Sequence, residues 1–251
     1  RAGANGVFNI SGGIYVRANA GGGAGGPNVS VANGGGSGTV TVSGTGYVNV
    51  SAGDTWIGEG SAGTWNQNGG TAINSYVQLG RNAGATGNLS LNGGVFAASQ
   101  IAPGGGTSTM NFNGGTLKAT ASNDHFLRGL GQANVMAGGA VIDCGGNAIA
   151  IGQPLLDAGG GLTNIGSGTL YLNGINSYLG PTTISAGTLG GVGTFASAVS
   201  VASGAALAPG TASATGTMTI NSNLTLAAGS STHIKISLDG GPNNDQVAGL
   251  T

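Results

Sequence analysis

Charge is the scarcest property of this sequence. Only 5% of the 251 residues are charged, the formal net charge is −1, and the six basic residues are scattered along the chain. Nucleic-acid binding needs clustered lysine and arginine to displace counterions, so we expect no nucleic-acid partner. Long apolar runs are absent too, and none approaches the ~18 residues of a membrane-spanning helix. We therefore expect no membrane span in this chain.

Cysteine is almost missing. Cys144 is the single one, so no intrachain disulfide can form, and we expect it to be a small buried hydrophobic residue. A signal peptide is not found at the start, which begins directly in patterned sequence. Both ends are therefore expected to be cuts through a longer protein.

Glycine, by contrast, is abundant. The 56 glycines are about three times the usual ~7% share, but they lack the every-third-residue pattern of collagen. Hydrophobic residues make up 39% of the chain and alternate with polar ones, which is the period of a β-strand. This order favours a folded all-β protein over a disordered linker.

One phrase recurs in the first half of the chain: apolar-x-apolar-(Ser/Asn)-Gly-(Gly/Thr). It is found at 8–16, 40–48, 65–73, 89–97 and 110–118, and its first glycines lie 32, 25, 24 and 21 positions apart. A period in the low twenties is typical of one coil of a β-solenoid. We predict a right-handed parallel β-helix with roughly 21–25 residues per rung.

The repeat also predicts which side chains face inward. The core columns are expected to contain Phe8, Ile10, Val40, Val42, Trp65, Leu89, Leu91, Met110, Phe112, Leu170, Leu172, Ile184 and Leu189. Gln67 interrupts one column and would need a buried hydrogen-bond partner. At the glycine corners, Asn68, Asn92 and Asn113 are expected to stack as a ladder of side-chain amides.

The stretch "GSGTLYLNGINSYLGPTTISAGTL" (166–189) carries a more specific pattern. Its phrase resembles the autotransporter-associated β-strand repeat family at Gly166, Gly168, Thr169, Leu170, Leu172, Gly174, Asn176, Tyr178, Gly180, Thr182, Ile184, Gly187, Thr188 and Leu189. The resemblance implies a secreted or surface-displayed bacterial β-helix. We predict N-terminal solenoid rungs over 1–122 and a repeat segment over 123–251 that continues the same solenoid.

Catalytic residues are sparse. The seven acidic residues share no repeat column, and the regular aspartate of calcium-binding β-rolls is missing, so we predict no catalysis, metal or cofactor. In "NDHFLRG", Asp124, His125 and Arg128 are either a general acid–base set or a solvated corner, and 124–131 is the one candidate for a short helical turn. Trp56 is a candidate platform for stacking a sugar.

The function that fits these features is structural. We expect an extracellular surface fibre, filament subunit or stalk that associates end to end through its terminal rungs, because uncapped strand edges are templates for pairing. The alternative is an adhesin that binds glycans or matrix through side loops such as 17–28 and 99–108. A polysaccharide lyase or hydrolase is the least favoured hypothesis.

Overall fold

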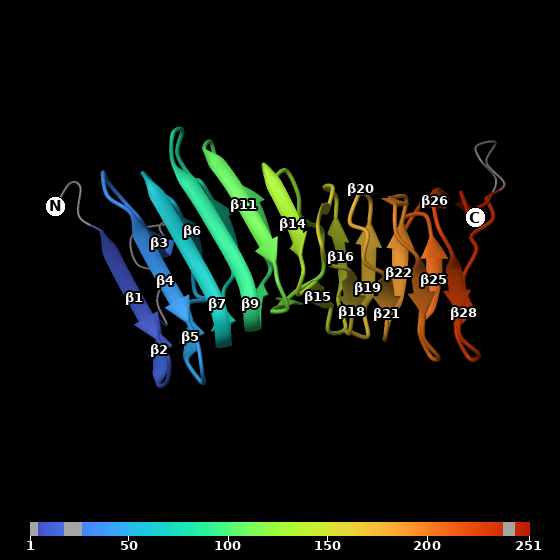
Figure 1. Cartoon of the computed structure of the whole chain (residues 1–251), viewed down its shortest axis with the longest axis horizontal. Helices are drawn as coiled ribbons and strands as arrows, with labels where there is room; N and C mark the ends of the chain where they lie inside the picture. Colours follow the sequence, from blue (N-terminus) through green and yellow to red (C-terminus); the bar gives the residue numbers. More distant parts are fainter. Residues whose placement is uncertain (1–4, 18–26, 238–243) are drawn as a thin grey trace.

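Parallel strands account for the whole architecture. The computed structural model describes residues 5–17, 27–237 and 244–251, and no helix occurs in these segments. The strands follow one another along a rod from the N-terminal to the C-terminal end (Figure 1), and every pairing between named strands is parallel. The prediction of an all-β solenoid is therefore confirmed.

Each coil contributes strands to stacks that run along the rod. The first stack contains β1 (Gly6–Ile10), β4 (Gly38–Val42), β7 (Ala62–Ile73), β9 (Thr86–Ala98), β11 (Thr107–Phe112), β14 (Gln132–Met136) and β17 (Leu156–Ala158). The second contains β2 (Ile14–Val16), β5 (Tyr47–Asn49), the second halves of β7 and β9, β12 (Thr116–Ala119), β15 (Ala140–Asp143), β18 (Leu162–Asn164), β21 (Thr182–Ile184), β24 (Val199–Val201) and β27 (Leu224–Leu226).

Two further stacks complete the coils. The third contains β3 (Pro27–Val31), β6 (Asp54–Ile57), β8 (Tyr76–Leu79), β10 (Gln100–Pro103), β13 (Asn123–Leu127), β16 (Ala148–Ile151), β19 (Thr169–Leu172), β22 (Thr188–Gly191), β25 (Ala206–Pro209) and β28 (Ser231–Thr232). The fourth is confined to the C-terminal half and contains β20 (Ile175–Asn176), β23 (Thr194–Phe195), β26 (Thr217–Ile220) and β29 (Gln246–Ala248).

The register gives the length of each coil. In the N-terminal half, residues that pair lie 32 (Gly6 and Gly38), 25 (Gly38 and Gly63), 24 (Ala62 and Thr86) and 21 (Val95 and Thr116) positions apart, the same steps as the recurring glycines. Two coils near the C-terminal end are shorter than 21–25 residues, at 20 (Leu162 and Thr182) and 17 (Thr182 and Val199). Each of these two coils passes through the fourth stack in a strand of only two residues, β20 or β23.

The predicted core columns are buried with one exception. The others are at most 7% exposed, and the buried apolar side chains form one cluster from Ile10 to Ile220. Phe8 is 45% exposed, so its assignment to the core is wrong. Its side chain belongs to the inward column, but β1 is the first strand of its stack, and among the described residues no strand pairs with its N-terminal edge.

Polar side chains inside the solenoid have partners. Gln67 is fully buried and accepts a hydrogen bond at Oε1 from the indole nitrogen of Trp65 (3.0 Å), while its Nε2 donates to the carbonyl of Gly69 (2.7 Å). Asn164 is also buried, and its Nδ2 donates to the carbonyl of Ala186 (2.8 Å). These bonds remove the penalty for burying an amide.

The Asn-Gly-Gly corners bend β7 and β9 from the first stack into the second. Gly70 and Gly94 have φ angles of 61° and 64°, a region that glycine enters without a Cβ penalty. Beside them, Asn92 donates from Nδ2 to Oδ1 of Asn68 (2.8 Å), and Asn113 donates to Asn92 (3.1 Å). The three amides thus form a ladder along the rod.

The segment 124–131 contains no helical turn. It begins as strand β13, which pairs with β16 through a register shift between Asn123 and Leu127. Phe126 and Leu127 are both fully buried although they are neighbours in sequence. A bulge explains this pair, because it lets two successive side chains escape strict alternation.

Candidate interaction surfaces

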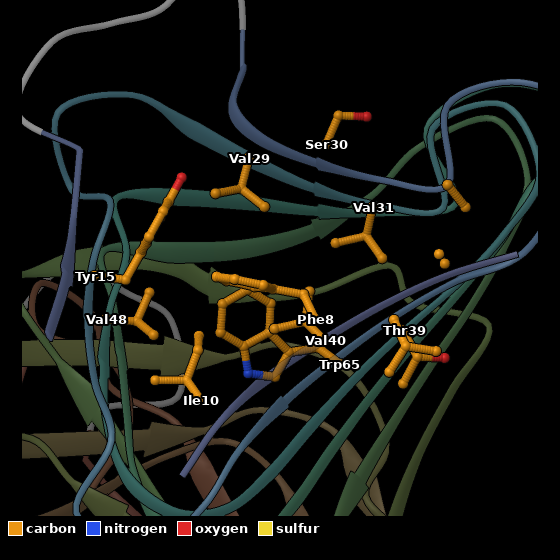
Figure 2. Close-up of a pocket in the computed structure, with 14 residues that line it drawn as sticks. Phe8, Ile10, Tyr15, Val29, Ser30, Val31, Thr39, Val40, Val48 and Trp65 are labelled. Carbon is orange, nitrogen blue, oxygen red and sulfur yellow. The ribbon is translucent and has the colours of Figure 1, made fainter. Parts of the chain in front are cut away.

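The N-terminal end of the rod opens into its apolar interior. A cavity of about 380 Å³ lies there, and its lining includes Phe8, Tyr15, Val40 and Trp65 (Figure 2). The rings of Phe8 and Tyr15 meet edge to face with their centroids 5.4 Å apart. Among the described residues, β1, β2 and β3 have no strand beyond them, so backbone edges surround this apolar opening.

The edge strand β2 exposes hydrogen-bonding groups and apolar side chains together. The carbonyl of Gly13 and the N–H of Arg17 bond to β5, so the alternating Ile14 and Val16 direct their backbone groups to the free edge. The side chains of Ile14 and Val16 are 78% and 54% exposed. Such an edge is suited to pairing with another strand.

The C-terminal end of the rod exposes the last residue of a column of inward side chains that begins at Tyr15. One inward column contains Tyr15, Val48, Ala72, Phe96, Leu117, Ile142, Asn164, Ile184, Val201 and Leu226. Its last residue, Leu226, is 46% exposed because β27 is the last strand of the second stack in the described chain.

An ion pair holds the C-terminal coil together. Lys235 Nζ lies 2.8 Å from Asp245 Oδ2 and also donates to the carbonyl of Pro209 (2.9 Å). The side chain of Asp245 is fully buried and also accepts from the backbone N–H groups of Gly216 and Lys235. Burial raises the pKa of the Asp245 carboxyl, but these hydrogen bonds and the Lys235 charge outweigh burial and keep the pKa below its usual value.

Trp56 is not an open platform. It lies on β6 in the third stack and is only 6% exposed, because the guanidinium carbon of Arg81 lies 3.4 Å from its ring centroid. Nη1 of Arg81 also donates to Oε1 of Gln78 (2.7 Å). The expectation of an exposed stacking surface at Trp56 is therefore wrong. A cation–π contact covers the ring.

Asp124 and His125 form a solvated pair. His125 Nδ1 lies 2.8 Å from Asp124 Oδ1, and the two side chains are 47% and 86% exposed. No ion pair joins Arg128 to Asp124 in the described segments, and Arg128 itself is exposed. Its charge acts on Tyr76, where burial and then Asp54 raise the phenol pKa while Arg81 and Arg128 lower it. The described segments therefore show no ion pair that would join Arg128 to Asp124 and His125 as an acid–base set.

Sequence reasoning missed Tyr76, Gln78 and Arg81. The sequence pattern could have identified two of them. In "YVQL", alternation places Tyr76 and Gln78 on the outer face of the strand when Val77 and Leu79 face the core. Of the loops expected to bind ligands, 99–108 is largely strand, in β10 and β11, and most of 17–28 lies outside the described residues.

The described part of the chain contains neither a cluster of metal-ligating side chains nor a membrane-spanning helix. No group of three or more His, Cys, Asp or Glu side chains is placed to hold a metal ion. No helix there has the length and apolarity needed to cross a membrane.

Parallel stacking, a continuous apolar interior and glycine corners define this chain as a β-solenoid protein. Residues 162–190, from β18 into β22, match the model of the passenger-associated-transport-repeat family, so the chain carries an autotransporter passenger-type repeat. Searches of curated proteins and of solved structures gave no match. Repeat and fold together indicate an extracellular, passenger-like structural domain, of a kind that is not typically catalytic.

Proposed function

We propose that this chain is a structural rod of the cell surface that lengthens by end-to-end stacking of its terminal coils. The observation that carries the proposal is the column from Tyr15 to Leu226, which is unbroken through the rod and which no other described strand covers at either end. In a stack, β2 of one copy pairs with β27 of the next. Tyr15 then occupies the rung that follows Leu226.

Both driving forces for this contact are present at the ends. Stacking covers the apolar opening that Phe8 and Tyr15 line, and burial of apolar area contributes roughly 25 cal/mol per Å². It also satisfies the backbone groups of Ile14 and Val16 that face the free edge of β2. A filament subunit and a stalk share this geometry. They differ in whether the next coil belongs to another copy or to the same chain.

A concentration series examined by negative-stain electron microscopy and light scattering tests the proposal. The unaltered chain should form rods that lengthen by whole units as its concentration rises. Val16→Pro should stop this growth, because proline removes an edge N–H that bonds to none of the described strands of the same copy. Val16→Ala is the matched control, since it shortens the same exposed side chain but keeps the N–H.

The result for the unaltered chain decides the matter even if the proline variant folds poorly. Short rods of one length at every concentration would refute end-to-end stacking. Equal growth of Val16→Pro, with its circular dichroism unchanged, would show that β2 is not the contact.

A further inference from the structure

The outer face of the third stack between β6 and β13 gathers charge in a chain that has little. The whole sequence contains six basic and seven acidic residues. Of these, Asp54, Arg81 and Arg128 all act electrostatically on Tyr76, a half-buried residue of β8 that points outward. Glu59 lies two residues after β6 and accepts a hydrogen bond from the hydroxyl of Ser30, which pairs in register with Trp56. By contrast, the outward positions of β4, of β11 and of the segments 64–68 in β7 and 86–92 in β9 hold only Thr, Asn and Ser.

Trp56 lies within this face with an unmet hydrogen-bond donor. Its indole nitrogen is buried and has no partner in the described structure. Arg81 covers the ring and is fixed by Gln78, whose Nε2 donates in turn to the carbonyl of Pro103 (3.2 Å). A buried donor without a partner is rare in native proteins and calls for an explanation such as a bound group. Movement of Arg81 away from the ring would open this donor to a ligand.

Charge balance on this face selects the kind of ligand. The two carboxylates, Asp54 and Glu59, offset the two guanidinium groups, Arg81 and Arg128, so neither anions nor cations are attracted over a distance. Carboxylate and guanidinium groups are planar and make paired hydrogen bonds, which suits neighbouring hydroxyl groups. The ring of Tyr76 adds an apolar face next to these polar groups.

We propose that Asp54, Trp56, Tyr76, Arg81 and Arg128, here called the Tyr76 site, bind a neutral saccharide unit of a glycan. The sugar ring stacks on Tyr76, and its hydroxyl groups bond to Asp54 and Arg81. The Trp56 indole N–H donates to a sugar oxygen once Arg81 leaves the ring. This site lies on the side of the rod, so it operates whether or not the ends stack.

Immobilised oligosaccharides test this assignment with the intact protein. The panel contains neutral chains of glucose, galactose, mannose and N-acetylglucosamine units, together with uronate-containing and sialylated chains. A neutral chain that binds is then titrated by calorimetry. Tyr76→Ala and Arg81→Ala should each weaken binding by about fivefold to tenfold, the range expected for loss of an aromatic or charged contact.

Tyr171→Ala is the matched control. Tyr171 is a half-buried tyrosine on β19, also outward on the third stack, where its ring lies against Gly190. Its removal should leave the affinity unchanged. Indole fluorescence should shift on binding and lose this shift in Trp56→Phe, because the other tryptophan, Trp65, is in the core.

Three results would overturn the assignment. These are no binding to any neutral chain, binding to acidic chains alone, or an equal loss of affinity in Tyr171→Ala and Tyr76→Ala. None of these results affects the electron microscopy of rod growth, so the saccharide site and the stacking of the ends are tested independently.

Discussion

A single methyl group at Gly87 should disrupt the solenoid. Gly87 is buried on β9, and a Cβ added there would lie 2.2 Å from the carbonyl oxygen of Ile57, 2.3 Å from the nitrogen of Gly80 and 2.8 Å from the carbonyl carbon of Leu79. All three are backbone atoms, so no side chain can rotate away. The coil must shift instead.

The size of the effect follows from two opposing contributions. Overpacking a tight interior costs about 1–3 kcal/mol, and this site lies at the upper end because the clash is with main chain. Replacing glycine with alanine in a strand recovers about 0.5–1 kcal/mol by restricting the unfolded chain. Gly87→Ala should therefore lower the free energy of unfolding by about 2 kcal/mol.

Denaturant unfolding followed by circular dichroism measures this difference. Gly146→Ala is the matched control, because no atom lies within 4 Å of its added Cβ and its φ angle is not positive. That variant should be as stable as the unaltered protein or more stable by up to about 1 kcal/mol, because the restriction of the unfolded chain meets no opposing clash. Equal stability of Gly87→Ala and Gly146→Ala would refute the close approach of adjacent coils at this corner.

Three further predictions concern buried polar groups. Gln67→Leu should lower the free energy of unfolding by about 1–3 kcal/mol, because it leaves the indole N–H of Trp65 unpaired. The same substitution should cost less in a Trp65→Phe background, which has no indole N–H to leave unpaired, and an equal cost in both backgrounds would contradict this. The pKa of Asp245 is lower in the folded protein than in the unfolded chain, so its stabilisation is fully present above the unfolded pKa of about 3.9 and is lost as the pH falls through the folded pKa. Asp245→Asn should therefore flatten the acid limb of the stability–pH profile. An acid limb that this substitution leaves unchanged would show that the Lys235 contact is unimportant. Burial raises the pKa of Cys144 to about 12, so a thiol reagent at pH 8 should label it only after unfolding; rapid labelling of the native protein would show that this coil opens.

The fold was largely predictable because the solenoid is built from a local rule repeated along the chain. Alternation identified inward residues such as Leu89 and Leu170, and the spacing of glycines such as Gly69 and Gly93 gave the offset between paired strands. Backbone pairing between successive coils then follows from that offset. Few other proteins reveal long-range register so directly, because their paired strands are not copies of one phrase.

The interaction surfaces were less predictable because they depend on residues from different coils. Trp56 was a candidate platform for stacking a sugar, yet Arg81, which follows β8 one coil later, covers its ring. Likewise, Arg128 was grouped with Asp124 and His125 by sequence, whereas its charge acts on Tyr76. Contacts of this kind arise across the outer face, where no repeating apolar pattern constrains the side chains.

The sequence by itself determined the period, the inward columns and the amide ladder of Asn68, Asn92 and Asn113, because each follows from strand alternation and glycine corners. Only the tertiary structure decided which ends of the columns stay open, as at Phe8, and which outward residues meet, as at Arg81 and Trp56. The physical reason is that burial depends on the coil next in space, whereas a repeat in sequence specifies only the coil itself.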